Sequence, residues 1–493
     1  MIITRRQALA AAGGAMAVTA VGACSGEGSD PNAPVTINMA LGGAANDYTP
    51  DDDNVIATTL GDAIGAQVVH QHSPEDLAAS LAAGDAPDIF RVDRNQLQRF
   101  VEQGLVLDLS DYQDQLGDYV DFVGEETAGR GVIDGKLSAI TRYQNNVNGV
   151  TYWIRQDWLD NLGLETPTTL EEFREVLRAF TEDDPDGNGQ NDTYGLTGAA
   201  PDPLFRPLWG SFGTPGPGTI YLDESGELRS GYEDEGVADA IAYIADLQTS
   251  GYVDPDSYSL SSMEARDRGF QGGAGVMAQS WTAVKKQEAE ELAVAANPDA
   301  EWVQLDLFPT ADGSDGVIPV KADAVFFALP ATLAGDDTKV EKIIELINYV
   351  STEEGNRLVL YGVEGTHYEL GADGRIEPLP AMAEEGGYFF VYQLVGRDEL
   401  PYLEVKFPDQ QRYFERAHDQ PVVTDYQSFI TSPDGFNQSE ADRFSEEQLV
   451  SFLTGATAPS EYPAFVDSLK SQFGYDAFVE AAATQLDDLG VRS

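Results

Sequence analysis

Strand-like and helix-like segments alternate along the first part of the chain, and this alternation limits the folds open to it. Apolar runs at 35–41, 66–70 and 86–92 have the composition of buried strands. A helix-like stretch separates the first two runs, and another at 77–83 separates the second from the third. Parallel strands need a crossover segment between them, and that segment is usually a helix. The sequence therefore predicts an α/β fold built on a parallel sheet.

Further segments extend this pattern. A helix is predicted to start at Thr168 and Thr169, because acids at the next turn can complete a capping box and the apolar residues up to Phe180 share one face. Residues 339–350 predict a second amphipathic helix. The Asp-Gly-Lys sequence at 134–136 predicts a tight turn that leads into a strand at 137–143.

The length and charge of the chain bound its organisation and its partners. A chain of 493 residues corresponds to about three ordinary domains or two large ones, and 42% hydrophobic residues are enough for substantial cores. The net charge is −55, with a pI near 4.1. Such a field repels nucleic acid and anionic lipid, because phosphate binding needs clustered Lys and Arg. We expect no nucleic-acid partner.

The N-terminal segment has the features of a secretory signal. Arg5 and Arg6 precede an apolar, small-residue run at 8–23, which is too short to be read as a spanning helix. The double Arg resembles a twin-arginine export signal, although Ala8 stands where that motif prefers Phe. Val-Gly-Ala-Cys at 21–24 resembles a bacterial lipobox, in which the cysteine is lipidated. We predict a signal peptide at 1–23, a lipid on Cys24, a flexible tether at 24–33, and a globular body outside the cell membrane.

An acidic loop follows the helix predicted at 168–180. Its alternating oxygen-bearing residues begin like a calcium-binding EF-hand loop. The candidate ligands are Asp184, Asp186, Asn188, Gln190 through its backbone carbonyl, and Asp192. The twelfth position is Gly195 instead of a bidentate Glu, which argues against a helix-opening sensor. A metal-free turn is the alternative, but close carboxylates repel one another without a cation. We predict a structural calcium that holds the loop.

Several motifs together resemble a known family. LAAGDAPDI at 81–89 and GLVLDL at 104–109 resemble the first lobe of bacterial extracellular solute-binding proteins, family 1, which serve ABC transporters. WIRQDWLDNLGL, PTTLEEF and DPDGNGQNDTYGLTG, between 153 and 198, resemble the alginate-binding and LipO-like lipoprotein subfamily. VMAQSW at 276–281, YGVEGTHY at 361–368 and LTG at 453–455 are similar to further markers of that subfamily.

The resemblance implies a fold, a division of the chain and a set of partners. The fold is the type II periplasmic-binding-protein-like α/β fold, with two lobes joined by hinge strands that close on a sugar. Lobe one would hold 34–145 and 318–370, and lobe two 146–317 and 371–493. The partners would be two permease subunits and the ATPase of an importer, and the protein would be monomeric. In the resembling proteins an acid at the tenth loop position closes the calcium site, whereas this chain has Thr193 there.

Candidate ligand contacts follow the predicted strands, because the cleft of an open α/β sheet lies beyond the carboxyl ends of its strands. Aromatic rings can stack on sugars while polar groups bind the hydroxyls. The candidates are Arg91, Asp93 and Asn95 after one strand, Tyr143 and Asn145 after another, Arg206 and Trp209 in a Pro-rich loop, and Trp281. Trp281 matches by position a cleft Trp of the family. Packing is the alternative for each aromatic residue, and Trp153 and Trp158 are expected in the core.

These observations favour a binding protein over an enzyme. The main alternative is an extracellular glycoside hydrolase or lyase carrying calcium, but a carboxylate pair can always be proposed among 84 acids. No G-x-S-x-G elbow, Walker A or dinucleotide fingerprint occurs in the chain. A calcium-dependent adhesion or sensor module is a second alternative. For the ligand, Arg91 or Arg206 can pair with a uronate, whereas the acidic body favours neutral oligosaccharides.

Overall fold

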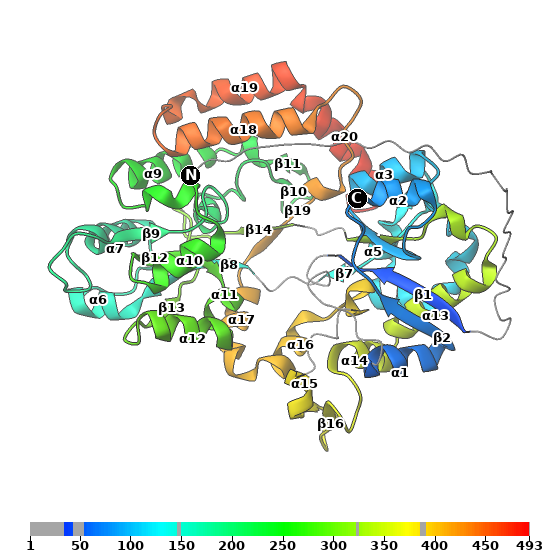
Figure 1. Ribbon diagram of the computed structural model, residues 1–493. Coiled ribbons are helices and arrows are strands. Elements are labelled where there is room, and N and C mark those ends of the chain that lie inside the picture. Colours follow the sequence, from blue (N-terminus) through cyan, green and yellow to red (C-terminus); the bar gives the residue numbers. More distant parts are fainter. Residues whose placement is uncertain (1–33, 43–53, 145–148, 322–324, 385–390, 493) are drawn as a thin grey trace, which may run out of the picture.

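The structure is a computed structural model that describes residues 34–42, 54–144, 149–321, 325–384 and 391–492. The predicted signal peptide at 1–23, Cys24 with its tether, and Asn145 lie outside these residues. Figure 1 shows two α/β lobes with a group of C-terminal helices above them. This arrangement agrees with the predicted type II fold.

The first lobe is built on a five-stranded sheet. Its strand order is β2 (Ala66–His70), β1 (Val35–Ala40), β3 (Ile89–Val92), β15 (Phe326–Ala328) and β6 (Ile140–Thr141). Strand β1 pairs in parallel with both β2 and β3, which confirms the predicted parallel sheet. Strand β15 runs antiparallel to β3 and β6 and comes from a distant part of the chain.

Helices accompany this sheet and supply its core. They are α1 (Val55–Ile64), α2 (Leu77–Ala83), α3 (Arg94–Glu102), α4 (Gly117–Val123), α5 (Glu125–Gly129), α13 (Asp337–Ser351) and α14 (Glu353–Tyr361). Helix α13 confirms the helix predicted at 339–350. It buries Val340, Ile343, Ile344 and Ile347, and these side chains belong to the same apolar cluster as Ile37 of β1.

The second lobe is built on a four-stranded sheet. Its order is β13 (Trp302–Gln304), β8 (Val150–Arg155), β12 (Ala274–Ser280) and β9 (Tyr194–Thr197). Its helices include α6 (Gln156–Leu162), α7 (Leu170–Glu182), α8 (Arg206–Gly210), α9 (Val237–Thr249), α10 (Ser262–Phe270), α11 (Trp281–Lys285) and α12 (Gln287–Ala296). Trp153 and Trp158 are buried in the core, as predicted.

Helix α7 shows how its sequence determines its N-terminus. The Oγ1 atom of Thr169 accepts a hydrogen bond from the Glu172 N–H at 3.2 Å, and the Glu172 carboxylate accepts from the Thr168 N–H at 2.8 Å. These bonds satisfy donors that the helix itself leaves free. Phe173 and Phe180 are among the buried residues of the helix, so the predicted cap and apolar face are both confirmed.

The strand predicted at 137–143 is wrong as a single element. The chain forms three short strands there, β5 (Lys136–Leu137), β6 and β7 (Tyr143–Gln144). Each pairs with a different neighbour: β5 with β4 (Val132–Ile133), β6 with β15, and β7 with β18 (Gly396–Arg397). An apolar run predicts strand character but not the number of partners, so the interruptions could not be foreseen.

Short strand pairs lie where the chain passes between the two sheets. Strand β7 follows the first sheet and precedes β8 of the second, and it pairs in parallel with β18. Strand β14 (Ile318–Lys321) links β13 of the second sheet to β15 of the first, and it pairs in parallel with β19 (Val422–Asp425). We call β14 and β19 the connecting strands; Figure 1 shows β14 between the lobes.

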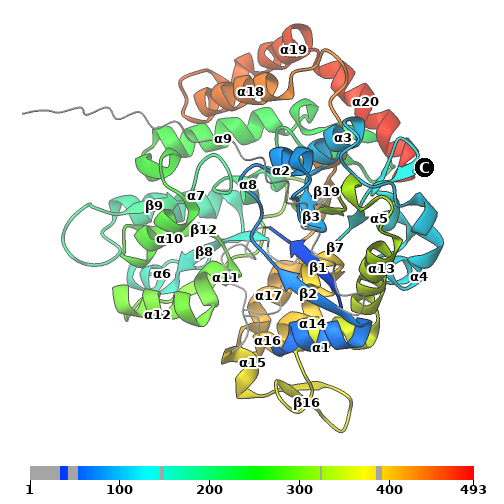
Figure 2. The same ribbon diagram turned by 45° about the vertical axis from the view of Figure 1, so that its right-hand side comes forward.

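The C-terminal helices contact both lobes. They are α18 (Gln438–Leu453), α19 (Tyr462–Phe473) and α20 (Tyr475–Asp488). Helix α18 packs on α9 of the second lobe, whereas Figures 1 and 2 both show α20 beside α3 of the first. Gln485 of α20 exchanges hydrogen bonds with the Thr431 backbone at 2.8 and 2.9 Å, and Phe429 nearby lies under the Arg130 guanidinium at 4.7 Å.

Most of the remaining elements lie in the lower part of the molecule in Figure 1. Helices α16 (Glu399–Lys406) and α17 (Gln411–His418) pack on each other, and α17 also packs on α11. Below them in Figure 1 lie helix α15 (Pro380–Glu384) and a hairpin formed by β16 (Tyr368–Leu370) and β17 (Ile376–Pro378). A second hairpin, formed by β10 (Ile220–Leu222) and β11 (Leu228–Ser230), lies near β19. Within the described residues, no helix combines the length and apolar character needed to cross a bilayer.

Candidate functional site

The predicted contacts on the first lobe lie at the carboxyl end of β3. Arg91 is half-buried on β3, and its Cδ atom lies 3.0 Å from where a Cβ on Gly42 would stand. Gly42 has a φ of +67°, so both its backbone and this contact require a glycine. Among the described residues, Arg91 has no hydrogen-bond or ion-pair partner.

Asp93 and Asn95 have different surroundings from Arg91. Asp93 is the N-cap of α3: its carboxylate accepts from the Gln96 N–H at 2.8 Å, and Gln96 accepts from the Asp93 N–H at 3.1 Å. This capping box accounts for the Asp93 side chain without a ligand. Asn95 is exposed and lines an open groove of about 690 Å³ together with residues between Ser432 and Asp442.

Tyr143 lies where the chain leaves the first sheet. Its N–H donates to the Val395 carbonyl at 2.8 Å, and its ring meets Phe122 edge-on, with centroids 6.2 Å apart. The pairing with β18 brings Gly396 so close that a Cβ there would lie 2.0 Å from the Tyr143 carbonyl oxygen. Tyr143 is therefore partly engaged in holding β7 and β18 together.

A cluster of cations and tyrosines lies next to this strand pair, and no local sequence pattern indicated it. The Arg397 guanidinium lies 3.5 Å from the ring centroid of Tyr402 and 4.2 Å from that of Tyr392. It also donates to the Glu399 carboxylate at 2.6 and 2.9 Å. These contacts fix Arg397 between β18 and α16 by charge and by cation–π attraction.

Lys406 belongs to this cluster and gives a prediction about pH. Burial, and secondarily the charge of Arg397, lower the pKa of Lys406 from 10.5 to about 8. Between those pH values the unfolded chain binds more protons than the folded one, so this group's contribution to stability rises as pH rises from 8 to 10.5. We expect Lys406→Met to stabilise the fold at pH 7 by on the order of 1–2 kcal/mol, with the gain disappearing above pH 10.

Thermal unfolding of this variant and the wild type at pH 7 and pH 10 measures the effect. Lys136→Met is the control, because Lys136 is largely exposed and its pairing with Asp108 is a surface contact at 3.5 Å. An equal gain in stability in both variants would show that burial does not depress the Lys406 pKa. A gain in the stability of Lys406→Met that does not depend on pH would show the same.

A pocket of about 450 Å³ brings together two of the predicted contacts, Arg206 and Trp209. We call it the connecting-strand pocket, because β14 and β19 form part of its wall. It is lined by Gly149, Pro201, Asp202, Arg206, Trp209, Pro215, Gly216, Pro217, Gly218, Thr219, Ile318, Pro319, Val320, Lys321, Ala417, Gln420, Val422, Asp425, Gln427, Leu449 and Leu453. The first-lobe candidates Arg91, Asp93, Asn95 and Tyr143 are not in this wall.

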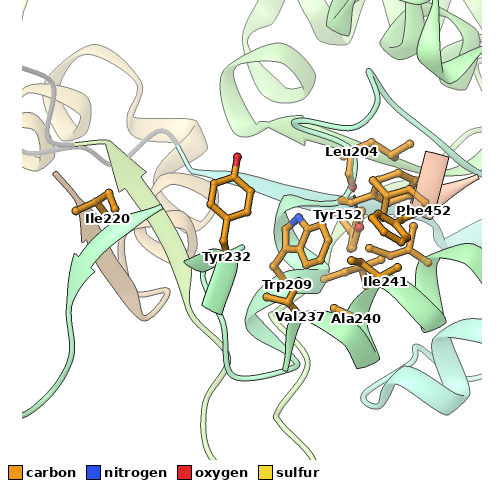
Figure 3. Packing of buried hydrophobic residues seen from close by; sticks show 14 of the residues in the cluster. Tyr152, Leu204, Trp209, Ile220, Tyr232, Val237, Ala240, Ile241 and Phe452 are labelled. Atoms are coloured by element: carbon orange, nitrogen blue, oxygen red, sulfur yellow. Dashed lines mark hydrogen bonds between the residues drawn. The ribbon is translucent and has the colours of Figure 1, made fainter. Parts of the chain in front are cut away.

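Trp209 lines this pocket but is mostly enclosed. It is 8% exposed, and Figure 3 shows its indole among the side chains of a large core cluster that includes Tyr152, Val237 and Phe452. A Cβ on Gly216 would lie 3.0 Å from the indole, so the backbone there packs directly on the ring. Trp209 therefore offers a ligand a small part of its surface instead of a whole stacking face.

Arg206 is already paired within the pocket. Its Nε donates to Asp202 Oδ1 at 2.8 Å, and its Nη2 donates to Asp202 Oδ2. The two side chains remain 28% and 57% exposed, so solvent and ligand can reach them. The expectation that Arg206 alone could receive a uronate left out this partner. Arg206 and Trp209 lie on the short helix α8, not in a Pro-rich loop as predicted, and Asp202 stands four residues before that helix begins.

Asp425 and Lys321 complete the charged lining. Asp425 is buried, and its Oδ1 accepts from the backbone N–H groups of Ile220 at 3.1 Å and Gln427 at 3.0 Å. Burial raises the pKa of Asp425, while these hydrogen bonds and the charge of Lys321 oppose the rise. Sequence reasoning missed both residues, because only the pairing of β14 with β19 brings them together.

Trp281 lines none of the pockets found among the described residues. It is fully buried at the start of α11, with ring centroids 5.6 Å from both Phe407 and Phe414. The prediction that Trp281 stacks on a sugar finds no support in this arrangement, because no ring face is accessible. Helices α16 and α17 cover it, and nothing in the sequence around Trp281 indicated that they would.

The acidic loop keeps its candidate ligands close together. The Asn188 amide nitrogen donates to Asp186 at 2.9 Å and to Asp192 at 3.2 Å, and the Gly189 N–H donates to Asp184 at 3.0 Å. The other carboxylate oxygen of Asp184, Oδ1, is buried without a hydrogen-bond donor. Within the described residues, no group of three or more His, Cys, Asp or Glu is arranged to hold a metal. The oxygens fit calcium in kind, although they do not form a coordination shell in this conformation.

Thr193, the tenth residue of this loop, does not close the site. Its hydroxyl donates to the Phe180 carbonyl at 2.7 Å and is buried against α7. The loop is attached to the lobe by this bond and by the Asn161 amide, which donates to the Pro185 carbonyl at 3.1 Å.

Curated relatives and solved structures resemble the chain. It is 29% identical over 306 residues to the polygalacturonan/rhamnogalacturonan-binding protein YtcQ of Bacillus subtilis, covering 60% of this chain and 59% of the relative. It is 27% identical over 330 residues to lipoprotein LipO of the same organism, covering 64% and 61%. The match thus spans about three fifths of these relatives. Alginate-binding protein AlgQ2, solved without calcium ion, matches with a TM-score of 0.66 at 17% identity, covering 91% of this chain and 97% of that one.

A second solved structure is an EF-hand mutant of the ABC-transporter substrate-binding protein FusA of Streptococcus pneumoniae, in complex with fructo-nystose. Its TM-score is 0.66 at 16% identity, covering 94% of this chain and all of that one. These structural likenesses show the fold. The family itself is shown by a match to the family model of bacterial extracellular solute-binding proteins, which covers residues 62–357, more than half of the chain. The chain belongs to the bacterial extracellular solute-binding proteins.

Proposed function

We propose that the protein is the carbohydrate receptor of an ABC importer and that it binds its ligand in the connecting-strand pocket. The observation that carries this proposal is the composition of the pocket wall. Second-lobe residues such as Arg206 form one part, and the connecting strands β14 and β19 form another. A ligand held there touches the segment that links the lobes, so its binding is coupled to their relative position.

The relatives support the ligand class. YtcQ is named for binding polygalacturonan and rhamnogalacturonan, AlgQ2 for binding alginate, and FusA was solved with fructo-nystose. FusA is also named as part of an ABC transporter, which supports permease subunits and an ATPase as partners. These proteins are binding proteins, which fits a receptor that releases its sugar unchanged. LipO is named a lipoprotein, which supports lipid attachment through Cys24 on the outer face of the membrane.

Calorimetric titration of the purified protein with neutral and uronic oligosaccharides tests the proposal, with mass analysis of the recovered sugar. A receptor binds at micromolar concentration and returns the sugar intact. Ligand at one hundred times its dissociation constant should also add about 2.7 kcal/mol of stability. A sugar recovered cleaved would favour the glycoside hydrolase or lyase instead, and the absence of binding would rule out the carbohydrate receptor.

We further propose that the loop from Asp184 to Asp192 binds a structural calcium ion. Asp184, Asp186 and Asp192 would supply carboxylate oxygens, Asn188 an amide oxygen, and Gln190 its carbonyl. The buried Asp184 Oδ1, which has no donor, supports this assignment. Calcium would neutralise the crowded carboxylates and hold the loop against α7.

Chelation gives the corresponding prediction. Because Thr193 is turned away, the site should bind at the weak end of the range for extracellular modules, about 0.1–1 mM. Free calcium at ten times the dissociation constant should stabilise the fold by about 1.4 kcal/mol, a gain that EGTA removes. Asp184→Asn should abolish the calcium-dependent shift in melting temperature.

Asp183→Asn is the matched control for this measurement. Asp183 is adjacent, but its carboxylate pairs with Arg178 at 3.0 Å and it is not one of the alternating positions. The control should keep the full calcium-dependent shift. A wild type whose melting temperature is the same in calcium and in EGTA would contradict a structural calcium.

A further inference from the structure

The charged residues on the wall of the connecting-strand pocket are balanced in sign, and two of them form an ion pair. Its charged lining residues are Asp202, Arg206, Lys321 and Asp425, two of each sign. Arg206 and Asp202 share two parallel hydrogen bonds, one of them 2.8 Å long. Lys321 and Asp425 are partners in the β14–β19 register, and the Lys321 charge favours the ionised carboxylate. The described residues of the pocket wall therefore carry no net formal charge, inside a protein whose net charge is −55.

This pairing has a direct consequence for an anionic ligand. A uronate that approached Arg206 would have to displace the Asp202 carboxylate from a bidentate contact, or else lie beside a carboxylate of like charge. Both events are unfavourable, because a displaced acid loses charge-assisted hydrogen bonds and like charges repel. The field of the surrounding acidic surface adds to this repulsion.

The same pair suits a neutral sugar. The guanidinium has five N–H donors and the carboxylate can accept several hydrogen bonds, so the pair has capacity beyond the two bonds it makes internally. A sugar hydroxyl both donates and accepts, and neighbouring hydroxyls can therefore bind the carboxylate and the guanidinium side by side. Arg206 and Asp202 are both partly exposed, which leaves this capacity open to the pocket.

We propose that Asp202 is a specificity-determining residue: by occupying Arg206, it makes the connecting-strand pocket select neutral oligosaccharides over acidic ones. This inference rests on the proposed function, because it requires that the pocket binds carbohydrate. Arg91, the other residue expected to be able to pair with a uronate, is not part of this arrangement. It lies outside this pocket, at the end of β3, and has no partner among the described residues.

Calorimetric titration of the purified protein with two sugar classes tests the inference. The probes are neutral fructo-, gluco- and galacto-oligosaccharides and, as the acidic class, oligogalacturonates of the same length. The wild type should bind at least one neutral probe about tenfold more tightly than the oligogalacturonate. Asp202→Asn should lower the affinity for the neutral probe about tenfold and raise the affinity for the oligogalacturonate about tenfold, because Arg206 is then released from its carboxylate partner.

Two further variants separate specificity from folding. Arg206→Gln removes the same ion pair. It should lower the affinity for the neutral probe without raising the affinity for the acidic one. Asp246→Asn is the matched control, because Asp246 pairs with Arg174 at 2.6 Å on the surface of the same lobe and lines none of the pockets described above. It should leave both affinities unchanged. Melting temperatures without ligand show whether each variant is folded.

The outcomes distinguish the inference from the function on which it rests. A wild type that prefers the oligogalacturonate, or an Asp202→Asn variant with an unchanged affinity ratio, overturns the role of Asp202 and leaves the receptor intact. If no sugar of either class binds, the proposed function fails and the inference fails with it.

Discussion

Replacing Trp281 by alanine should lower the free energy of unfolding by about 3–5 kcal/mol, the range found for large aromatic residues removed from a core. Trp281 is fully buried between Phe407 and Phe414, in a cluster that also contains Trp153 and Trp302. The substitution would leave a cavity where β12 meets α11, under helices α16 and α17. Urea unfolding monitored by circular dichroism measures the loss.

The affinity for the sugar separates a packing role from a binding role. Because no face of Trp281 is exposed, its replacement should change the dissociation constant by less than about threefold, or under 1 kcal/mol, at a temperature where the variant is folded. Trp281→Phe is the control: it keeps a ring, and it breaks no hydrogen bond because Nε1 has no partner in the described part of the chain. A folded alanine variant with normal stability and no sugar binding would show that Trp281 contacts the ligand after all.

A second large effect is expected at the ion pair between β8 and α6. Arg155 is buried, and its guanidinium donates to the Asp157 carboxylate at 2.7 and 2.5 Å while lying over Trp158 at 4.6 Å. Asp157→Ala would leave this charge buried without a counter-charge. We expect a loss of about 3–5 kcal/mol in the free energy of unfolding.

The companion variant Arg155→Met tests whether the buried charge is the cause. Removing the charge together with its partner is often close to neutral, so Asp157→Ala with Arg155→Met should be more stable than Asp157→Ala alone. Urea unfolding of the two single variants and the double variant completes the cycle. Strictly additive losses would show that packing, and not an unpaired charge, sets the effect. None of these variants should alter sugar affinity, because neither residue lines the connecting-strand pocket.

The parts of the fold that follow from local sequence were predictable. The alternation of strands and helices from 35 to 92 predicted a parallel sheet, and β1, β2 and β3 form it. The cap at Thr169 and the apolar face of α7 follow from hydrogen bonds and spacings within one helix. Such features depend on residues three or four positions apart, which a sequence displays directly.

The parts that depend on distant segments were not predictable. The run at 137–143 is divided because β15 and β18, from far along the chain, pair with different pieces of it. Trp281 is covered by Phe407 and Phe414 of a later segment, so a family position suggested exposure where packing gives burial. The connecting-strand pocket arises from a strand pairing that local pattern does not encode, whereas Arg206 and Trp209 were found because both lie in one short Pro-containing stretch of the sequence.

Small-angle X-ray scattering of the purified protein, with and without a saturating oligosaccharide that it returns intact, tests the central claim most directly. A receptor whose lobes close on a sugar should show a smaller radius of gyration when the sugar is bound, because the ligand contacts the strands that set the position of the lobes. Identical scattering curves in the presence of bound sugar would contradict capture by lobe closure.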